Sequence, residues 1–226
     1  MSEASSAYRG CRERIGEIAA NLGPVDLTGT IPACPEWTVT DLVAHLAGVA
    51  EDFAAGNLDK AGADAWTKAQ IARRSKLEMP ALISDWDDIS IELDPSLDEI
   101  PAGVAAMLIG DAVTHEHDLR GAVNVPGARD SYAMWIGLER NIRRFGKRIK
   151  DAEQPSVVVQ CEGREWQAGV LKPAVELEAD HFELLRALTG RRTLQEITSL
   201  AWTGDPKPYL ELVSSYPVAR SSLSES

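Results

Sequence analysis

The sequence predicts an α+β fold in which a helical bundle is followed by a smaller α/β domain. Two observations carry this prediction. Apolar residues recur three and four positions apart through the first 150 residues, which is typical of amphipathic helices. After Lys150 the pattern changes to short β-branched runs such as S-V-V-V-Q-C, which favour strands. We therefore expect an up-and-down bundle in residues 1–150, a small domain in residues 155–215 and a flexible tail in residues 216–226.

The spacing predicts six bundle helices, over residues 4–22, 39–54, 59–76, 79–93, 101–121 and 132–149. Thr38 is expected to cap the second of these, with Asp41 three residues later in a capping-box position. Residues 27–37 contain two prolines and a glycine, and this composition predicts an irregular loop.

In the second domain, S-V-V-V-Q-C, the turn-like E-G-R and E-W-Q-A-G-V predict a hairpin, and A-V-E-L-E-A predicts a third strand. Asp180 is expected to cap a helix that stops at Gly190. T-L-Q-E-I-T-S-L-A-W and P-K-P-Y-L-E-L-V are expected to form short helical pieces.

The composition excludes several classes of function. A formal net charge of -12 argues against nucleic acid and anionic membrane surfaces as partners, because both favour basic proteins. There is no run of 18 apolar residues, and the first residues are polar and acidic, unlike a secretory signal. The three cysteines lie far apart, outside any C-x-x-C spacing, and this favours a reducing cytoplasmic location.

The most informative residues are His45, Asp111 and His115. Asp111 and His115 are four residues apart and project from the apolar face of one predicted helix. His45 lies at the edge of the apolar stripe of another helix. A buried carboxylate is costly unless it is paired or binds a metal. Two histidines and one carboxylate from two bundle helices would form a three-ligand site with an open position, as expected of catalytic zinc.

Each residue also has a simpler interpretation. His45 could be a core-edge histidine bonded to a backbone carbonyl, and Asp111 could belong to a buried Asp–Arg or Asp–His pair. Asp118 could orient a ligand histidine, or it could form a salt bridge with an arginine. We expect His117 and His181 at the surface, and Cys34 is the cysteine we would test for reactivity.

Two motifs resemble those of the mycothiol-dependent maleylpyruvate isomerase family. The first is I-P-A-C-P-E-W-T-V-T-D-L-V-A-H-L, and the second is D-A-V-T-H-E-H-D-L-R-G-A. The later segment G-R-R-T-L-Q-E-I-T-S-L-A-W-T-G-D-P is similar to the small domain that often follows. The resemblance implies a DinB-like bundle that holds one divalent metal, usually Zn²⁺, with Ni²⁺ as another candidate.

The same resemblance assigns the metal ligands to His45, Asp111 and His115, which the helical spacing also selects. The isomerase motif carries Glu at the acidic position, whereas this chain carries the shorter Asp111. An arginine of the small domain assists catalysis in the isomerase, and Arg191 in T-G-R-R is its nearest match here.

The functional prediction is a zinc-dependent enzyme that uses a low-molecular-weight thiol such as mycothiol. The thiol would take part in isomerisation of, or S-transfer to, a small electrophilic substrate. If that substrate carries a carboxylate, Arg191 would be suited to bind it. The alternative is a non-catalytic metal-containing protein that binds a small molecule or regulates a partner. The oligomeric state, with a homodimer among the candidates, stays open.

Overall fold

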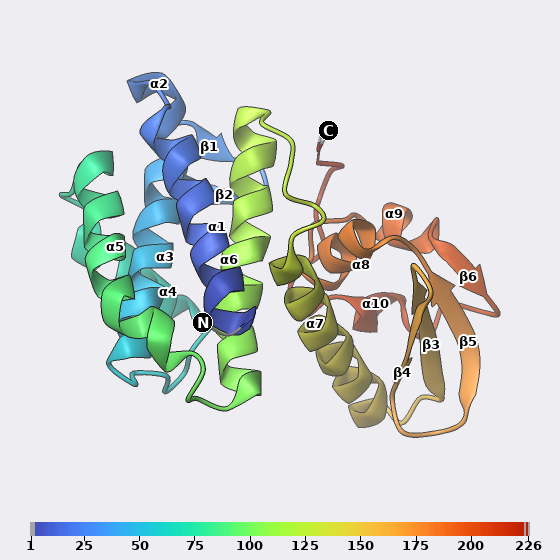
Figure 1. The fold of residues 1–226 in the computed structure, drawn as a ribbon. Coiled ribbons are helices and arrows are strands. Elements are labelled where there is room, and N and C mark those ends of the chain that lie inside the picture. The colour runs from blue at the N-terminus through green and yellow to red at the C-terminus, as the bar shows by residue number, and fades with distance from the viewer. Residues whose placement is uncertain (1–2, 224, 226) are drawn as a thin grey trace. The chain divides into compact units, whose positions relative to one another are not determined.

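The computed structural model of the chain describes residues 3–223 and 225, which form two compact units. The first unit contains residues up to Gly127 together with residue 225, and the second contains residues 128–223. The first is mainly helical, and the second combines helices with a sheet (Figure 1). The α+β class predicted from the sequence is therefore confirmed.

Four long helices build the first unit: α1, α3, α5 and α6 (Figure 1). Its elements are α1 (Glu3–Ala20), α2 (Pro24–Leu27), β1 (Thr30–Ile31), β2 (Cys34–Thr38), α3 (Val39–Ala54), α4 (Asp64–Arg74), α5 (Met79–Ser96) and α6 (Ala102–Val123). Helix α1 packs against α5 and α6, whereas α3 packs against α4, α5 and α6. Helix α3 also contacts the short α2, and it therefore lies at the centre of the bundle.

The predicted capping box at the start of α3 is confirmed. The Thr38 hydroxyl accepts a hydrogen bond from the Asp41 amide at 3.1 Å, and the Asp41 carboxylate accepts one from the Thr38 amide at 2.9 Å. The helix ends at Ala54, as the sequence predicts. Because the cap fixes the first turn, it also fixes the direction in which His45 projects two turns later.

The prediction of an irregular loop before α3 is wrong. Residues 30–31 and 34–38 pair as the antiparallel strands β1 and β2. Pro35 is exposed, and a two-stranded ribbon has only edge strands, where a residue without an N–H is tolerated. This ribbon places Trp37 immediately before the cap of α3.

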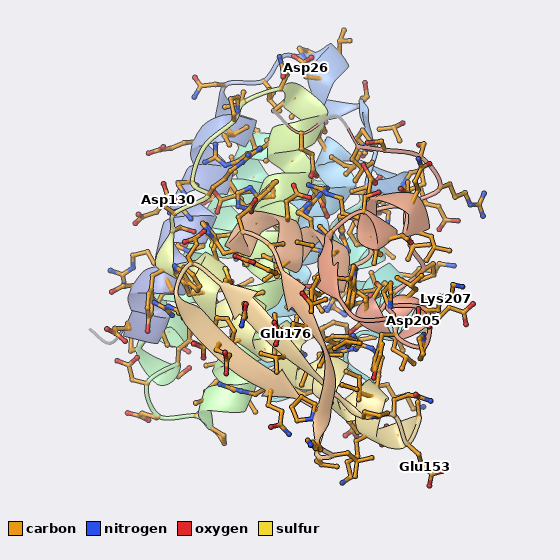
Figure 2. All side chains as sticks on the ribbon, turned by 90° about the vertical axis from the view of Figure 1, so that its right-hand side faces the viewer. Asp26, Asp130, Glu153, Glu176, Asp205 and Lys207 are labelled. Atoms are coloured by element: carbon orange, nitrogen blue, oxygen red, sulfur yellow. The ribbon has the colours of Figure 1, made fainter. Side chains whose placement is uncertain are left out.

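A four-stranded sheet organises the second unit. Its elements are α7 (Tyr132–Asp151), β3 (Ser156–Cys161), β4 (Arg164–Ala168), β5 (Pro173–Glu178), α8 (His181–Leu188), α9 (Leu194–Thr198), β6 (Ala201–Thr203) and α10 (Leu210–Val213). The strand order is β4-β3-β5-β6, with β3 and β5 parallel and the other pairs antiparallel. On β5, Val175 and Leu177 are buried while Glu176 projects from the exposed face (Figure 2).

The division between the units differs from the expected one in the position of α7. We expected residues 1–150 to form one domain, but α7 contacts β3, β4 and α8 of the second unit. Its apolar residues Leu138, Ile142 and Phe145 belong to the same buried cluster as the strands. The spacing correctly predicted an amphipathic helix, but it did not show which core the apolar face would join.

Two further differences lie near the end of the chain. Residues 201–203 form β6 because they pair with Glu176–Glu178 of β5, although a helical piece was expected to extend to Trp202. The segment expected to be a flexible tail makes a backbone contact, since the amide of Ala219 donates to the carbonyl of Arg192 at 3.1 Å. Ser224 and Ser226 of that segment lie outside the described residues.

The expectation that His117 and His181 lie at the surface is wrong, because only 4% and 7% of their surfaces are exposed. His181 lies between two acceptors. Its Nδ1 is 2.5 Å from Oε1 of Glu162, and its Nε2 is 2.7 Å from the carbonyl oxygen of Arg129. Because neither partner can donate, the ring must carry both protons to make both hydrogen bonds.

Other charged groups and one ring surround His181 as well. The imidazole of His181 stacks on the indole of Trp135, with the ring centroids 5.0 Å apart. The Arg164 guanidinium lies over the same indole, 3.9 Å from its centroid. The carboxylate of Asp130 is 3.9 Å from Nε2, and Asp180 caps the helix that His181 begins. Burial lowers the pKa of His181, but the hydrogen bonds to Glu162 and Arg129 outweigh it, so the net pKa is raised.

We predict that His181 makes the second unit less stable as the pH rises. A raised folded-state pKa gives stability that is complete below the unfolded value of about 6.5 and is lost as pH rises through the folded value. The hydrogen bond to His181 lowers the pKa of Glu162, so the stability that Glu162 contributes is lost only as the pH falls through its lowered pKa. Urea midpoints between about pH 5 and 9 should fall more for the wild type than for His181→Asn. Parallel curves for the two proteins would contradict this.

Within the described residues, no helix has both the length and the apolar character needed to cross a membrane.

Candidate metal centre

The structure brings His45, Asp111 and His115 together inside the first unit. His45 projects from α3, while Asp111 and His115 project from successive turns of α6. One ligand atom from each residue lies within 4.8 Å of the other two. Only 3% of His45 and 7% of His115 are exposed, so both imidazoles are buried. The i, i+4 spacing on α6 thus produces the arrangement expected from the sequence.

The distances within this group are longer than those of direct hydrogen bonds. The Nε2 atom of His45 is 3.4 Å from Oδ2 of Asp111, and the Nε2 atom of His115 is 3.7 Å from Oδ1 of the same carboxylate. An N–H···O hydrogen bond normally spans about 2.7–3.2 Å. Zinc bonds of about 2.0–2.2 Å in a tetrahedron separate neighbouring ligand atoms by about 3.3–3.6 Å. The spacing therefore fits three ligands around one ion better than a directly bonded Asp–His pair.

The other ring nitrogen of each histidine already has a partner. Nδ1 of His45 lies 2.9 Å from Oε1 of Gln70, and Nδ1 of His115 lies 2.9 Å from Oδ2 of Asp118. Metal-binding histidines usually donate their second N–H to a carboxylate or another oxygen in this way, which orients the ring. Both rings accordingly direct Nε2 toward Asp111. This contact places the Asp118 carboxylate where it can orient the His115 ring, which is one of the two roles considered for Asp118.

One side of the site is open to solvent. The Asp111 side chain is 32% exposed, so the expectation that it lies buried on the core face is only partly met. Trp37 covers another side, with its ring 4.8 Å from that of His45 and 5.4 Å from that of His115. An ion held here would thus have an aromatic wall on one side and access from solvent on another.

A second group that could hold a metal shares one of these histidines. It consists of Cys34, His115 and Asp118. It would need Nδ1 of His115, which already faces Asp118 at 2.9 Å, and the Cys34 sulfur is 3.8 Å from the Asp118 carboxylate. Because Nδ1 of His115 is already engaged in this hydrogen bond, we consider the group around Asp111 the better metal site. Burial raises the pKa of Cys11 and raises that of Cys161 to about 12, so these two remain protonated thiols.

Sequence reasoning missed Gln70. It lies on α4 and is fully buried, and α4 approaches α3 closely at Gly48. A Cβ added to Gly48 would lie 2.4 Å from Cβ of Gln70, so only glycine permits this contact. A glycine inside a predicted helix is a signal of close packing, but it does not show which residue approaches.

Arg191, the arginine predicted to assist catalysis, belongs to the second unit. It is 9% exposed, and its Nη1 donates to the carbonyl oxygen of Thr189 at 2.6 Å. The three candidate ligands all belong to the first unit. The catalytic role of Arg191 stays a prediction.

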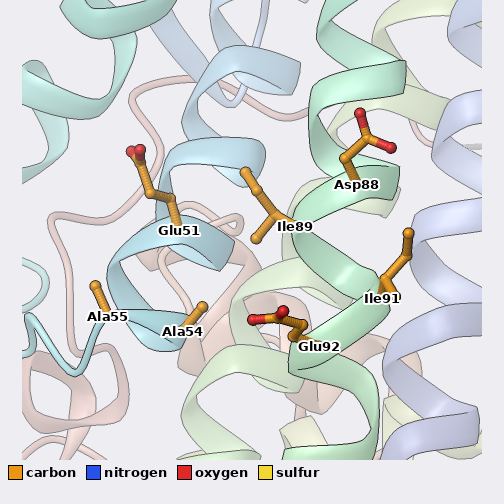
Figure 3. Close-up of a pocket in the computed structure, with 7 residues that line it drawn as sticks. All are labelled: Glu51, Ala54, Ala55, Asp88, Ile89, Ile91 and Glu92. Atoms are coloured by element: carbon orange, nitrogen blue, oxygen red, sulfur yellow. The ribbon is translucent and has the colours of Figure 1, made fainter.

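A cavity of about 400 Å³ lies between α3 and α5 (Figure 3). Its lining residues are Glu51, Ala54, Ala55, Asp88, Ile89, Ile91 and Glu92. The Glu51 carboxylate already pairs with Arg73 and Arg74. Because the cavity contains none of the three candidate ligands, it plays no part in the site.

Comparisons with known proteins agree with the motifs. Residues 8–124 match the family model described as the mycothiol maleylpyruvate isomerase N-terminal domain. A solved structure of a histidine-to-alanine mutant of the mycothiol-dependent maleylpyruvate isomerase is similar, with a TM-score of 0.56 and 13% identity over 89% of this chain and 92% of that one. Another structure of that isomerase gives a TM-score of 0.55 and 14% identity over 84% and 88%. No curated protein matches the chain.

At these identities the two solved structures show a shared fold alone. The family model, in contrast, covers more than half of the 226 residues, including all three candidate ligands. The chain belongs to the mycothiol maleylpyruvate isomerase N-terminal domain family.

Proposed function

We propose that the chain is a divalent-metal enzyme that uses a low-molecular-weight thiol, with mycothiol as the thiol and zinc as the metal. The observation that carries the proposal is the convergence of two Nε2 atoms and one carboxylate, with both Nδ1 atoms engaged elsewhere. This is the donor set of a catalytic rather than a structural zinc site, since it leaves a position for a further ligand.

Asp118 supports the open form of the site. A closed structural site would need a fourth protein ligand, and Asp118 was the candidate for that role. Its carboxylate instead lies on the far nitrogen of His115, where it orients the ring. The solvent exposure of Asp111 leaves room for an incoming thiol. These contacts favour the enzyme over the non-catalytic alternative.

The chemistry that a divalent ion would supply here is a lowered pKa for a thiol, which gives a thiolate nucleophile near neutral pH. His45 and His115 would bind the ion through the lone pairs of their Nε2 atoms, and the Asp111 carboxylate would contribute the negative charge. Trp37 keeps water away from one side of the pair of rings. A thiolate held at this position can add to an activated double bond and leave again after rotation, or it can displace a leaving group.

The proposal is tested by turnover with zinc-loaded protein. Maleylpyruvate and an epoxide serve as candidate electrophiles, with and without mycothiol. We expect conversion of at least one substrate that requires both zinc and the thiol and that is lost after treatment with a chelator. Zinc-loaded, folded protein that converts neither substrate would favour the alternative of a metal-containing binding or regulatory protein.

A further inference from the structure

A chain of buried hydrogen bonds leads from His45 to the surface of the first unit. Nδ1 of His45 faces Oε1 of Gln70 at 2.9 Å, and Nε2 of Gln70 donates to Oδ2 of Asp52 at 2.7 Å. The other oxygen of Asp52 accepts from Asn57 at 2.9 Å and from Arg73 at 3.1 Å. Gln70 is fully buried and Asp52 is 3% exposed, so the central part of this chain is shielded from water.

The chemistry of these groups fixes the direction of every hydrogen bond. An ionised carboxylate can only accept, so the amide end of Gln70 that faces Asp52 must be the NH₂ group. The opposite end is then the carbonyl oxygen, which also only accepts. Nδ1 of His45 must therefore carry the proton, and Nε2 is left with its lone pair. That lone pair faces Asp111.

Shape alone does not produce this result. The two ends of a glutamine amide are nearly the same size, so either end could face His45 without a change in packing. The close approach at Gly48 fixes where the Gln70 side chain lies, but not which end faces the ring. The charge of Asp52 makes that choice.

We propose that Asp52 is a positioning residue that sets the tautomer of His45 through Gln70 and so prepares Nε2 to bind a metal. The effect on metal binding rests on the proposed function. The tautomer of His45 does not, because it is a property of the metal-free protein. His115 provides an internal comparison. Its Nδ1 faces the carboxylate of Asp118 directly, so its tautomer does not depend on Asp52.

The decisive variant is Asp52→Asn, which keeps the size of the side chain but adds a donor. The new amide can donate to the oxygen of Gln70, which lets Gln70 turn its NH₂ group toward His45. His45 would then carry its proton on Nε2, where it blocks the metal. We expect zinc affinity, measured by competition with a coloured chelator, to fall about 10- to 100-fold. This is the loss usually seen when a residue hydrogen-bonded to a metal ligand is replaced.

The ring nitrogens can be observed directly in the metal-free protein. Two-bond ¹H–¹⁵N spectra at about pH 8, where a histidine is neutral, distinguish the two tautomers. We expect His45 to change from the Nδ1–H form toward the Nε2–H form in Asp52→Asn, while His115 stays unchanged. Glu51→Gln is the matched control, because it removes the same charge from the adjacent position of α3 and meets the hydrogen-bond chain only through Arg73, at the surface end beyond Asp52.

A double variant restores the chain with its polarity reversed. When Gln70→Glu is added to Asp52→Asn, the net charge of the wild type returns, and position 70 can again only accept from His45. We expect zinc affinity and the Nδ1–H tautomer to recover. The double variant also keeps the test usable if Asp52→Asn alone folds poorly. With the amide and the carboxylate exchanged between positions 52 and 70, one negative charge and both hydrogen bonds are restored.

The inference is overturned if His45 keeps the Nδ1–H form and zinc affinity is unchanged in folded Asp52→Asn, or if Glu51→Gln has the same effect. Wild-type protein that binds no zinc would contradict the proposed function instead. In that case the tautomer spectrum still decides the inference, because an Nε2–H form of His45 in the wild type would contradict it.

Discussion

Replacing His45 with alanine is expected to abolish zinc binding while the bundle stays folded. The change removes one of three candidate ligands, so the loss should exceed the about 10- to 100-fold expected for a partner outside the ligand set. The first unit should stay folded because the apolar neighbours of His45 on α3, Leu42, Leu46 and Val49, remain in the core. Elemental analysis after dialysis against zinc gives the stoichiometry, and circular dichroism gives the helix content.

The matched control for this variant is His117→Ala. His117 is 4% exposed and lies on α6, but it does not belong to the group around Asp111. We expect about one zinc per chain in the wild type and in His117→Ala, and none in His45→Ala or Asp111→Ala. Full zinc content in folded His45→Ala would show that the proposed ligands are not the metal site.

Replacing Arg14 with leucine should produce the largest loss of stability among the charged residues of the bundle. The Glu116 side chain is fully buried in α6, next to His115, and Arg14 of α1 binds both its oxygens at 2.7 Å. Breaking a buried ion pair from one side typically costs about 3–5 kcal/mol, because the remaining charge stays buried. Arg120 also binds Glu116, at 2.9 Å, so we expect a loss of about 3 kcal/mol, the lower end of this range.

Urea unfolding of the metal-free protein measures this effect. Lys68→Leu is the control, since it removes a positive charge from an exposed position of α4 and should change stability by less than about 0.5 kcal/mol. The pair also joins α1 to α6 beside His115, so Arg14→Leu should weaken zinc binding as well. Equal stability losses in the two variants would show that the Arg14–Glu116 pair does not stabilise the fold.

The features that could be predicted from the sequence are those with local patterns. The Thr38–Asp41 capping box fixes the start of α3, and its helical spacing extends to Ala54, where the helix ends. The i, i+4 spacing placed Asp111 and His115 on one face of α6, and the structure brings both close to His45. Their role as metal ligands stays a prediction.

The features that were missed depend on contacts between distant segments. Gln70 reaches His45 because α4 packs against α3 at Gly48, and nothing in the sequence around Gln70 indicates that partner. Residues 201–203 form a strand because β5 offers an edge, although the pattern of residues 193–202 favoured a helix. Helix α7 was predicted in the right place, but its apolar face joins the core of the second unit.

The most direct test of the central claim is zinc X-ray absorption spectroscopy of the loaded protein, before and after addition of mycothiol. Three protein ligands with one open position predict only nitrogen and oxygen neighbours at about 2.0–2.2 Å without thiol, and one sulfur neighbour at about 2.3 Å after mycothiol is added. A sulfur neighbour before any thiol is present would indicate the group that contains Cys34 instead. A spectrum without sulfur that mycothiol leaves unchanged would indicate a closed site and contradict the proposed enzyme.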